Sequence, residues 1–579
     1  MKNIRHNEQQ IATSVLVIGT GGSGLRAAIE LAESGVDVIA LGKRPRHDAH
    51  TALAAGGINA ALGTMDTEDS WQQHAADTIK ESYYLADPQT VEIVAKGAAE
   101  GITDLERYGM GFAREDDGRI SQRFFGAHTF RRTAFAGDYT GLEIQRSLVQ
   151  RSEQLDIDIL DTVYITDILT DNNRVFGAYG FDINDGTRYL IHADAVILAA
   201  GGHNRIWRRT SSRRDENTGD SFRLAVEAGA RLRDPELVQF HPSGIIEPEN
   251  AAGTLISEAA RGEGGILRNA LGERFMERYD PERMELSTRD RVALAAYTEI
   301  QEGRGTENGG VWLDISHLPR QTILERLPRV YQTMLEVQML DITREPIEIA
   351  PTAHYSMGGV WVHPEDHSTD VQGLYAIGEA SSGLHGANRL GGNSLIELLV
   401  FGRIVGQAAA AYSANLPAQT RSAEAVAQAR GELDRLLAAD GTENVRALQR
   451  AIRDMMTECA GVVRTEDGLN EGLARLKAIE ERMTNVGIHP DIAGFQDLAH
   501  AYDLKSSALS ARATLEAALE RRETRGCHNR SDYPDMDPQL QVNLVWSPDT
   551  GVTREEIAPI PDEINELIRE VSAAGKLVE

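Results

Sequence analysis

The sequence predicts an α/β protein of several domains. Near the N-terminus a short apolar run, a glycine-rich turn and a helical segment follow one another, which is typical of a parallel α/β sheet. A strand followed by a glycine-rich turn returns after residue 372. Between residues 423 and 523 the sequence becomes rich in Ala, Leu, Arg and Glu with helical periodicity, which predicts packed helices.

The first element is a βαβ unit. Residues 14–18 (SVLVI) predict a buried strand, residues 25–34 a helix and residues 36–41 a second strand. The turn between the first strand and the helix consists of Gly19, Thr20, Gly21, Gly22, Ser23 and Gly24. Glycines permit a tight turn and a close approach of a pyrophosphate, while the helix N-terminus supplies N–H donors. Such a string is weak alone, but its position favours a Rossmann-like dinucleotide site over an ordinary turn.

The second strand lacks the acidic residue that would bind a ribose in a simple NAD site. It ends in Leu41-Gly42-Lys43-Arg44. Two later strands also end in glycine-rich turns, at residues 199–202 and at Gly378-Glu379, where Glu379 could accept hydrogen bonds from cofactor hydroxyl groups. We therefore expect a longer cofactor that contacts the chain at several places.

The intervening segment, residues 241–350, is charged and lacks a βαβ rhythm, so we expect an insertion. The resulting prediction is a Rossmann-like cofactor-binding domain of residues 1–240 and 351–415, with an inserted α+β capping domain of residues 241–350. A helical domain (416–525) and an irregular C-terminal tail domain (526–579) should follow.

Composition excludes several classes of protein. The formal net charge is -29 and no dense Lys/Arg run occurs, which argues against a nucleic-acid partner. The two cysteines, Cys459 and Cys527, cannot form a disulfide framework, a zinc site or an iron–sulfur cluster, so we expect no metal site and a reducing compartment. The N-terminus lacks an apolar signal core. The most apolar run, residues 395–412, contains Glu397 and Arg403, so no membrane span is expected.

One segment makes a family resemblance specific. Residues 50–57 (HTALAAGG) resemble the HTxAAxGG segment of the succinate dehydrogenase/fumarate reductase flavoproteins. In that family the histidine is bonded covalently to FAD. The resemblance therefore implies FAD as the cofactor, linked through His50. The remaining implied FAD contacts outside the first turn are Lys43, Thr51, Gly56, Gly57, Asp220, Glu379, Ser394 and Leu395.

Further motifs extend the resemblance over almost the whole chain. They are QFHPSG (239–244), SEAARGEGG (257–265), STRD (287–290), PTAHYSMGG (351–359) and HGANRLGGNSL (385–395). By this resemblance the substrate is succinate or fumarate, a small dianion that requires cations and strong donors at both ends. Arg389 and His354 are the implied partners of one carboxylate, and His241 and Ser257 those of the other.

The resemblance also implies the proton chemistry. Flavin takes a hydride from one substrate carbon, and Arg289 exchanges a proton with the next. Arginine is a poor base because its pKa exceeds about 12, so the role requires a dry site and a proton relay. Glu258 and Arg261, three residues apart on a helical turn, are the implied relay. In another sequence such a pair would be an ordinary surface ion pair.

The sequence departs from the family motifs at two positions, and three alternatives to the predicted function remain open. Ala55 stands where related chains carry Gln or Glu, which removes a clue to the direction of the reaction, and Ser257 replaces the usual Thr.

The alternatives are an L-aspartate oxidase-like enzyme, a soluble fumarate reductase and a non-catalytic flavin-binding subunit. His50 and Leu390-Gly391-Gly392 disfavour the first, the lack of a CxxCH motif disfavours the second, and the intact set of charged residues disfavours the third.

The resemblance finally implies partners and a location. A flavoprotein of this kind passes electrons to an iron–sulfur subunit, which rests on a membrane anchor subunit, and from there to quinone. We therefore expect a peripheral subunit on the cytoplasmic face of the cell membrane, with succinate oxidation as the favoured direction.

Overall fold

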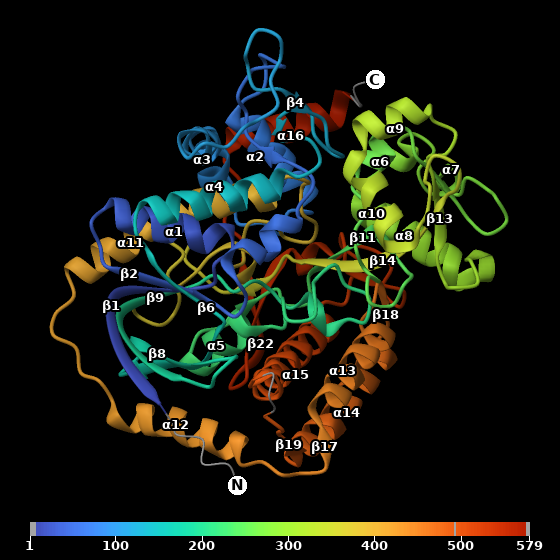
Figure 1. Ribbon diagram of the computed structural model, residues 1–579. Coiled ribbons are helices and arrows are strands. Elements are labelled where there is room, and N and C mark those ends of the chain that lie inside the picture. Colours follow the sequence, from blue (N-terminus) through green and yellow to red (C-terminus); the bar gives the residue numbers. More distant parts are fainter. Residues whose placement is uncertain (1–6, 491–493, 575–579) are drawn as a thin grey trace.

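The largest sheet confirms the α/β fold class. The computed structural model describes residues 7–490 and 494–574. The strands run in the order β6-β2-β1-β9-β8-β7, and β16 also pairs with β9 (Figure 1). Their bounds are β1 Glu8–Ile18, β2 Val38–Gly42, β6 Asp158–Asp161, β7 Val163–Asp171, β8 Arg174–Asp182, β9 Arg188–Leu198 and β16 Leu374–Ala376. The pairs of β1 with β2 and β9 are parallel, as the βαβ prediction requires.

Strand β1 begins earlier than its apolar run predicts. Its polar first half, from Glu8 to Thr13, pairs residue by residue with β9, from Arg188 to Ala193. Glu8 is also held by Arg430 at 2.8 Å. Because these partners lie far away in the sequence, the local pattern of residues 8–13 gives no sign of a strand.

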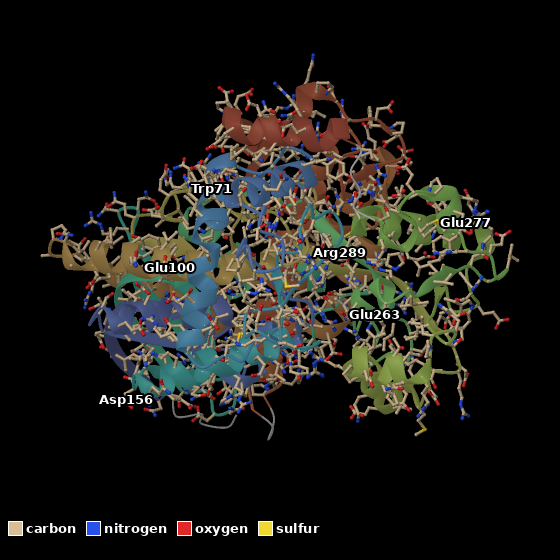
Figure 2. All side chains as sticks on the ribbon, turned by 90° about the horizontal axis from the view of Figure 1, so that it is seen from above. Trp71, Glu100, Asp156, Glu263, Glu277 and Arg289 are labelled. Carbon is tan, nitrogen blue, oxygen red and sulfur yellow. The ribbon has the colours of Figure 1, made fainter. Side chains whose placement is uncertain are left out.

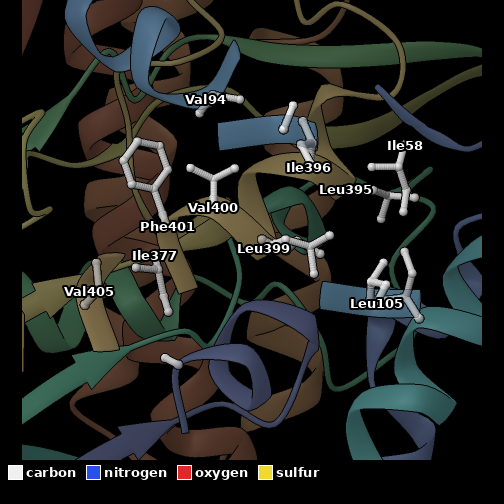
Figure 3. Packing of buried hydrophobic residues seen from close by; sticks show 14 of the residues in the cluster. Ile58, Val94, Leu105, Ile377, Leu395, Ile396, Leu399, Val400, Phe401 and Val405 are labelled. Carbon is white, nitrogen blue, oxygen red and sulfur yellow. The ribbon is translucent and has the colours of Figure 1, made fainter. Parts of the chain in front are cut away.

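Helices α1 (Gly22–Glu33) and α11 (Asn393–Ala414) pack closely beside this sheet. A side chain at Gly402 of α11 would overlap Arg26 of α1, since its Cβ would lie 2.7 Å from the Arg26 Cβ. Figure 3 shows the other face of α11, which packs on α3 (Pro88–Arg107): Val400 lies against Gly97, and Ile396 and Leu399 lie against Gly101. Helix α11 is long and apolar enough to cross a membrane, with a mean hydropathy of 1.4, but 61% of that window is buried inside the protein.

The inserted segment forms a separate lobe with its own core, at the right of Figure 1. Its sheet has the order β11-β14-β13-β12. The strands are β11 Val238–Ile245, β12 Ile266–Arg268, β13 Val311–Asp314 and β14 Ile347–Ser356, and the helices are α6 Ala259–Gly262, α7 Met276–Tyr279, α8 Arg289–Glu299, α9 Arg320–Arg326 and α10 Pro328–Gln338. The expected domain boundaries, near residues 240 and 350, fall inside β11 and β14, so these two strands run from one lobe into the other.

The C-terminal part begins with the expected helices. They are α12 Ala423–Leu437, α13 Val445–Cys459, α14 Glu466–Met483 and α15 Gln496–Glu520. After Gly526 the chain has more regular structure than its polar composition predicts. A hairpin of β21 (Val542–Ser547) and β22 (Gly551–Glu556) joins β10 (Leu232–Arg233), and α16 (Asp562–Ala574) packs on α2 (Trp71–Glu81). These partners are again distant in sequence.

Candidate active site

A cavity of about 500 Å³ runs from the glycine-rich turn to the junction of the two lobes. Figure 2 shows Arg289 near the middle of the molecule, with Glu263 and Glu277 on the inserted lobe. Almost every residue expected at the site lines this cavity. These are Gly19, Gly21, Gly22, Ser23, Lys43, His50, Thr51, Gly56, Gly57, Asp220, His241, Ser257, Glu258, Arg289, His354, Glu379, Arg389, Ser394 and Leu395. Gly24 and Arg261 do not line it: Gly24 packs against Gly19, and Arg261 lies beside Glu258.

The nucleotide end of the cavity is built by backbone atoms. Gly19 has a φ of +122°, and a Cβ on it would lie 2.1 Å from the carbonyl oxygen of Ala199. A Cβ on Gly24 would lie 1.9 Å from the carbonyl oxygen of Gly19. Helix α1 begins at Gly22, within this turn, so its N-terminal N–H groups and positive dipole favour a phosphate there. The turn therefore fits a dinucleotide cofactor.

Lys43 and Asp220, both expected to contact the cofactor, are bound to each other. The Lys43 Nζ donates to Asp220 at 2.7 Å and to Asp503 at 3.1 Å. Burial alone would lower the pKa of Lys43, but the two carboxylates outweigh burial and raise it, so the side chain stays charged. Glu379 accepts hydrogen bonds from the Asn204 Nδ2 at 2.6 Å and from the Ser356 N–H at 3.0 Å.

His50 lies beside a carboxylate that the sequence did not reveal. Its Nδ1 is 2.9 Å from the Glu216 Oε2, and Arg213 donates to the same carboxylate at 2.9 Å. Burial lowers the pKa of His50, but Glu216 outweighs that effect and raises it. The contact at Nδ1 leaves Nε2 as the ring nitrogen free to meet a cofactor. Glu216 belongs to no motif, so no signal in the sequence marks it.

At the other end of the cavity two histidines on neighbouring strands lie close together at the lobe junction. The rings of His241 on β11 and His354 on β14 are 5.4 Å apart and nearly perpendicular. The Ser243 N–H donates to the His241 Nδ1 at 3.2 Å, which assigns the ring proton to Nε2. The His354 Nδ1 lies 2.9 Å from the Ser211 Oγ. Burial, and then the nearby arginines, lower the pKa of both histidines, so both are neutral and each keeps one N–H donor.

Arg389 is a buried cation that pairs with no carboxylate among the residues that the structure describes. It donates to the Ser394 Oγ at 2.7 Å and to the Gln239 Oε1 at 3.0 Å, and its guanidinium lies 4.5 Å from the centre of the Tyr355 ring. No ion pair of Arg389 occurs in the described part of the chain, and its Nε has no hydrogen-bond partner there. Burial lowers its pKa to about 10, which still leaves it charged at neutral pH. A buried, unpaired guanidinium is a site for an anion.

Arg289, the first residue of α8, does have a carboxylate partner. Its Nε donates to the Glu258 Oε2 at 2.8 Å, and the Arg261 Nη2 lies 3.8 Å from the other oxygen of Glu258. Burial would raise the pKa of Glu258, but Arg289 and Arg261 lower it strongly, so Glu258 is ionised. The Gln239 Oε1 accepts from both Arg289, at 3.3 Å, and Arg389, which makes it a further site residue.

Comparison with known proteins agrees with this geometry. The protein-family model "FAD binding domain" matches residues 14–395, and "Fumarate reductase flavoprotein C-term" matches residues 449–563. One subunit of the fumarate reductase (CoM/CoB) of Methanothermobacter marburgensis is 41% identical over 92% of this chain and 96% of its own length. The chain belongs to the succinate dehydrogenase/fumarate reductase flavoprotein family.

Two further relatives show how far the family likeness extends. The succinate dehydrogenase flavoprotein subunit of Rickettsia bellii is 38% identical over 94% of this chain and 95% of its own length. The solved structure of Mycobacterium smegmatis Sdh1 in complex with UQ1 has a TM-score of 0.88 and 37% identity, covering 99% of this chain and 98% of that one. As a member of this family the protein is an FAD-dependent oxidoreductase.

Proposed function

We propose that the protein interconverts succinate and fumarate, with succinate oxidation as the physiological direction. One observation carries this proposal: Arg389 is buried and charged, and no carboxylate pairs with it in the described part of the chain. It lies next to two neutral histidines, and the side-chain amide of Gln239 links it to Arg289. A cluster of this kind binds a small dianion and pairs poorly with a neutral or cationic substrate.

The two ends of the dianion would have different partners. Arg389 offers its planar guanidinium to one carboxylate, and the N–H of His354 donates beside it. His241, whose Nε2 carries the proton, and the hydroxyl group of Ser257 would bind the other carboxylate. The hydrogen bonds of Gln239 hold both arginines in place. These contacts orient the substrate and replace water around its charges.

The proton would move through Arg289. When bound, FAD accepts or supplies the hydride of the reaction. Arg289 gives a proton to the neighbouring carbon in fumarate reduction and takes it in succinate oxidation. The ionised Glu258, at 2.8 Å, orients the guanidinium, and with Arg261 beside it would relay a proton from solvent to Arg289 or back.

His50 would carry the covalent bond to FAD. It lies in the same cavity as the glycine-rich turn, and Glu216 occupies its Nδ1, so we assign the bond to Nε2. The hydrogen bond to Glu216 fixes the orientation of the ring in the way that a carboxylate orients a metal-bound histidine.

We further propose an iron–sulfur subunit, a membrane anchor subunit and quinone as the route of the electrons. The structural relative from M. smegmatis was solved with UQ1, which supports a quinone as the final acceptor. Both cysteines of the sequence, Cys459 and Cys527, are buried and free, which supports a cluster on another subunit. The complex would place this chain on the cytoplasmic face of the membrane.

Assays on native membranes test the proposal. The chain should copurify with an iron–sulfur subunit, and succinate should reduce quinone faster than quinol reduces fumarate. A faster reverse reaction would change the direction to fumarate reduction, the activity named for the M. marburgensis relative. A chain that purifies without partners and oxidises L-aspartate with dioxygen would refute the proposal in favour of the oxidase alternative.

A further inference from the structure

A second, small cavity adjoins the Arg289–Glu258 pair. It is lined by Glu81, Gly126, Glu258, Thr288, Arg289, Arg389 and Gly391. Its volume is about 10 Å³, which is about what one water molecule needs. Two carboxylates and two guanidinium groups border it, so a water there would have several hydrogen-bond partners. The cavity therefore joins Glu81, which no motif marks, to the proton-exchanging pair.

Among the described residues, no cation forms an ion pair with the Glu81 carboxylate. It is the last residue of α2, it is partly buried, and the Asn388 Nδ2 donates to its Oε1 at 2.7 Å. No ion pair of Glu81 exists in residues 7–490 and 494–574. The charged groups that face it are Asp290, Arg283, Glu258 and Arg289. Burial, followed by the charge of Asp290, raises its pKa well above the usual range of a glutamate.

Arg261, the other neighbour of Glu258, is poorly suited to exchange protons with solvent. Its side chain is 0% exposed, and its Nη1 donates to the backbone carbonyl of Glu285. A guanidinium also keeps its proton at any ordinary pH. A partly exposed carboxyl group with a raised pKa changes its protonation state far more readily near neutral pH.

We propose that Glu81 exchanges the proton of the reaction between the Arg289–Glu258 pair and solvent, through one water molecule in the small cavity. This inference rests on the proposed succinate–fumarate chemistry. In fumarate reduction Arg289 gives its proton to the substrate carbon, and the Glu81 carboxyl group sends a proton through the water to restore the guanidinium. The Glu81 carboxylate then takes a proton from solvent. Succinate oxidation runs the same transfers in reverse, so no proton is gained or lost on the protein.

The two directions should have opposite pH dependence. Fumarate reduction requires protonated Glu81, so its rate should fall as the pH rises through the raised pKa. Succinate oxidation requires ionised Glu81, so its rate should fall as the pH drops through the same pKa. A residue with a purely structural role would not link the two profiles in this way.

The test compares Glu81→Gln and Glu81→Asp in the FAD-loaded protein, with soluble electron donors and acceptors. We expect Glu81→Gln to lower kcat about 10- to 100-fold in both directions. Its KM for succinate should stay within about twofold, the pH dependence of kcat should flatten, and the solvent deuterium effect on kcat should grow. Glu81→Asp keeps a carboxyl group and should keep the pH dependence. Glu92→Gln, which removes a carboxylate paired with Lys96 on the surface of α3, is the matched control and should behave as the wild type.

Each outcome decides a different question. If Glu81→Gln has the wild-type kcat and pH profile while Arg289→Gln is inactive, the role of Glu81 is refuted and the proposed function stands. If Glu81→Gln does not fold, a Glu81→Asp protein with bound FAD and no pH dependence refutes it equally. If the wild-type protein interconverts no succinate and fumarate, the proposed function itself is refuted.

Discussion

The two ends of the main cavity are made from different parts of the polypeptide. The nucleotide end is shaped by the backbone of a tight turn. A Cβ atom added at Gly24 or Gly19 would lie only 1.9 or 2.1 Å from a carbonyl oxygen. The substrate end consists of side chains from β11, β14, α8 and the loop before α11, where the decisive quantities are charges and donor positions.

The two ends therefore depend on different properties: backbone geometry at the nucleotide end and side-chain charges at the substrate end. At a site formed by backbone atoms, the chain binds the cofactor because the backbone can approach it closely. An added Cβ would block that approach. A side-chain site on two lobes holds a charge pattern that suits one class of substrate. Changes at the two ends should therefore have distinct effects: loss of flavin at one, and loss of turnover with flavin retained at the other.

The largest effect should come from Arg289→Gln. Removing the proton-exchanging group should lower kcat about 10³-fold in both directions, since it acts on the transition state. FAD and dicarboxylate binding should persist, as measured by flavin content and by malonate titration. Arg291→Gln, two residues further along α8 with a side chain 59% exposed, is the control and should keep wild-type activity. Near-normal turnover of Arg289→Gln would show that another group handles the proton.

His50→Ser should release the flavin from denatured protein, whereas the wild-type chain should remain fluorescent after acid precipitation and gel electrophoresis. Fumarate reduction should persist in the variant and succinate oxidation should be lost, because we expect the covalent bond to make the flavin a stronger oxidant. The exposed His47→Ser is the control and should keep its flavin. Flavin that washes off the denatured wild type would contradict the link and favour the aspartate oxidase alternative.

Gly24→Ala should weaken cofactor binding at the nucleotide end without changing the substrate end. Its Cβ would lie 1.9 Å from the Gly19 oxygen, so the turn must open. Overpacking costs about 1–3 kcal/mol, which weakens FAD binding about 10- to 100-fold when measured by fluorescence titration in the His50→Ser background. Gly431→Ala in α12, where nothing lies within 4 Å, should leave FAD binding unchanged and slightly stabilise the helix. Equal affinity in both variants would show that the tight turn is not needed for the cofactor.

The smallest effect concerns pH at the substrate end. The pKa values of His241 and His354 are lowered well below the usual value of about 6.5 for histidine. Both imidazoles therefore stay neutral even when the pH falls below that value. The KM for succinate should therefore change less than about threefold between about pH 6 and pH 8. A histidine with an ordinary pKa would gain a proton in this range and tighten dianion binding. A KM that falls tenfold as the pH drops through about 6.5 would contradict neutral histidines.

The sequence predicted features whose signal is local and missed those that depend on distant partners. The glycine-rich turn could be predicted because its geometry is set by six consecutive residues, and the charged residues at the substrate end were found through motif resemblance. The early start of β1, the pairing of β21 with β10 and the contact of Glu216 with His50 could not be predicted, because each depends on a partner more than 100 residues away. Gln239 stood inside a motif, but only its position between two arginines indicates its role.

We propose that Arg389, which has no ion pair in the described part of the chain, binds a dicarboxylate beside the flavin. Rapid mixing of the oxidised, FAD-loaded protein with succinate, followed by the absorbance of the flavin, tests this most directly. We expect succinate to bleach the flavin, fumarate to restore its colour, and L-aspartate to do neither. Bleaching by L-aspartate but not by succinate would contradict it.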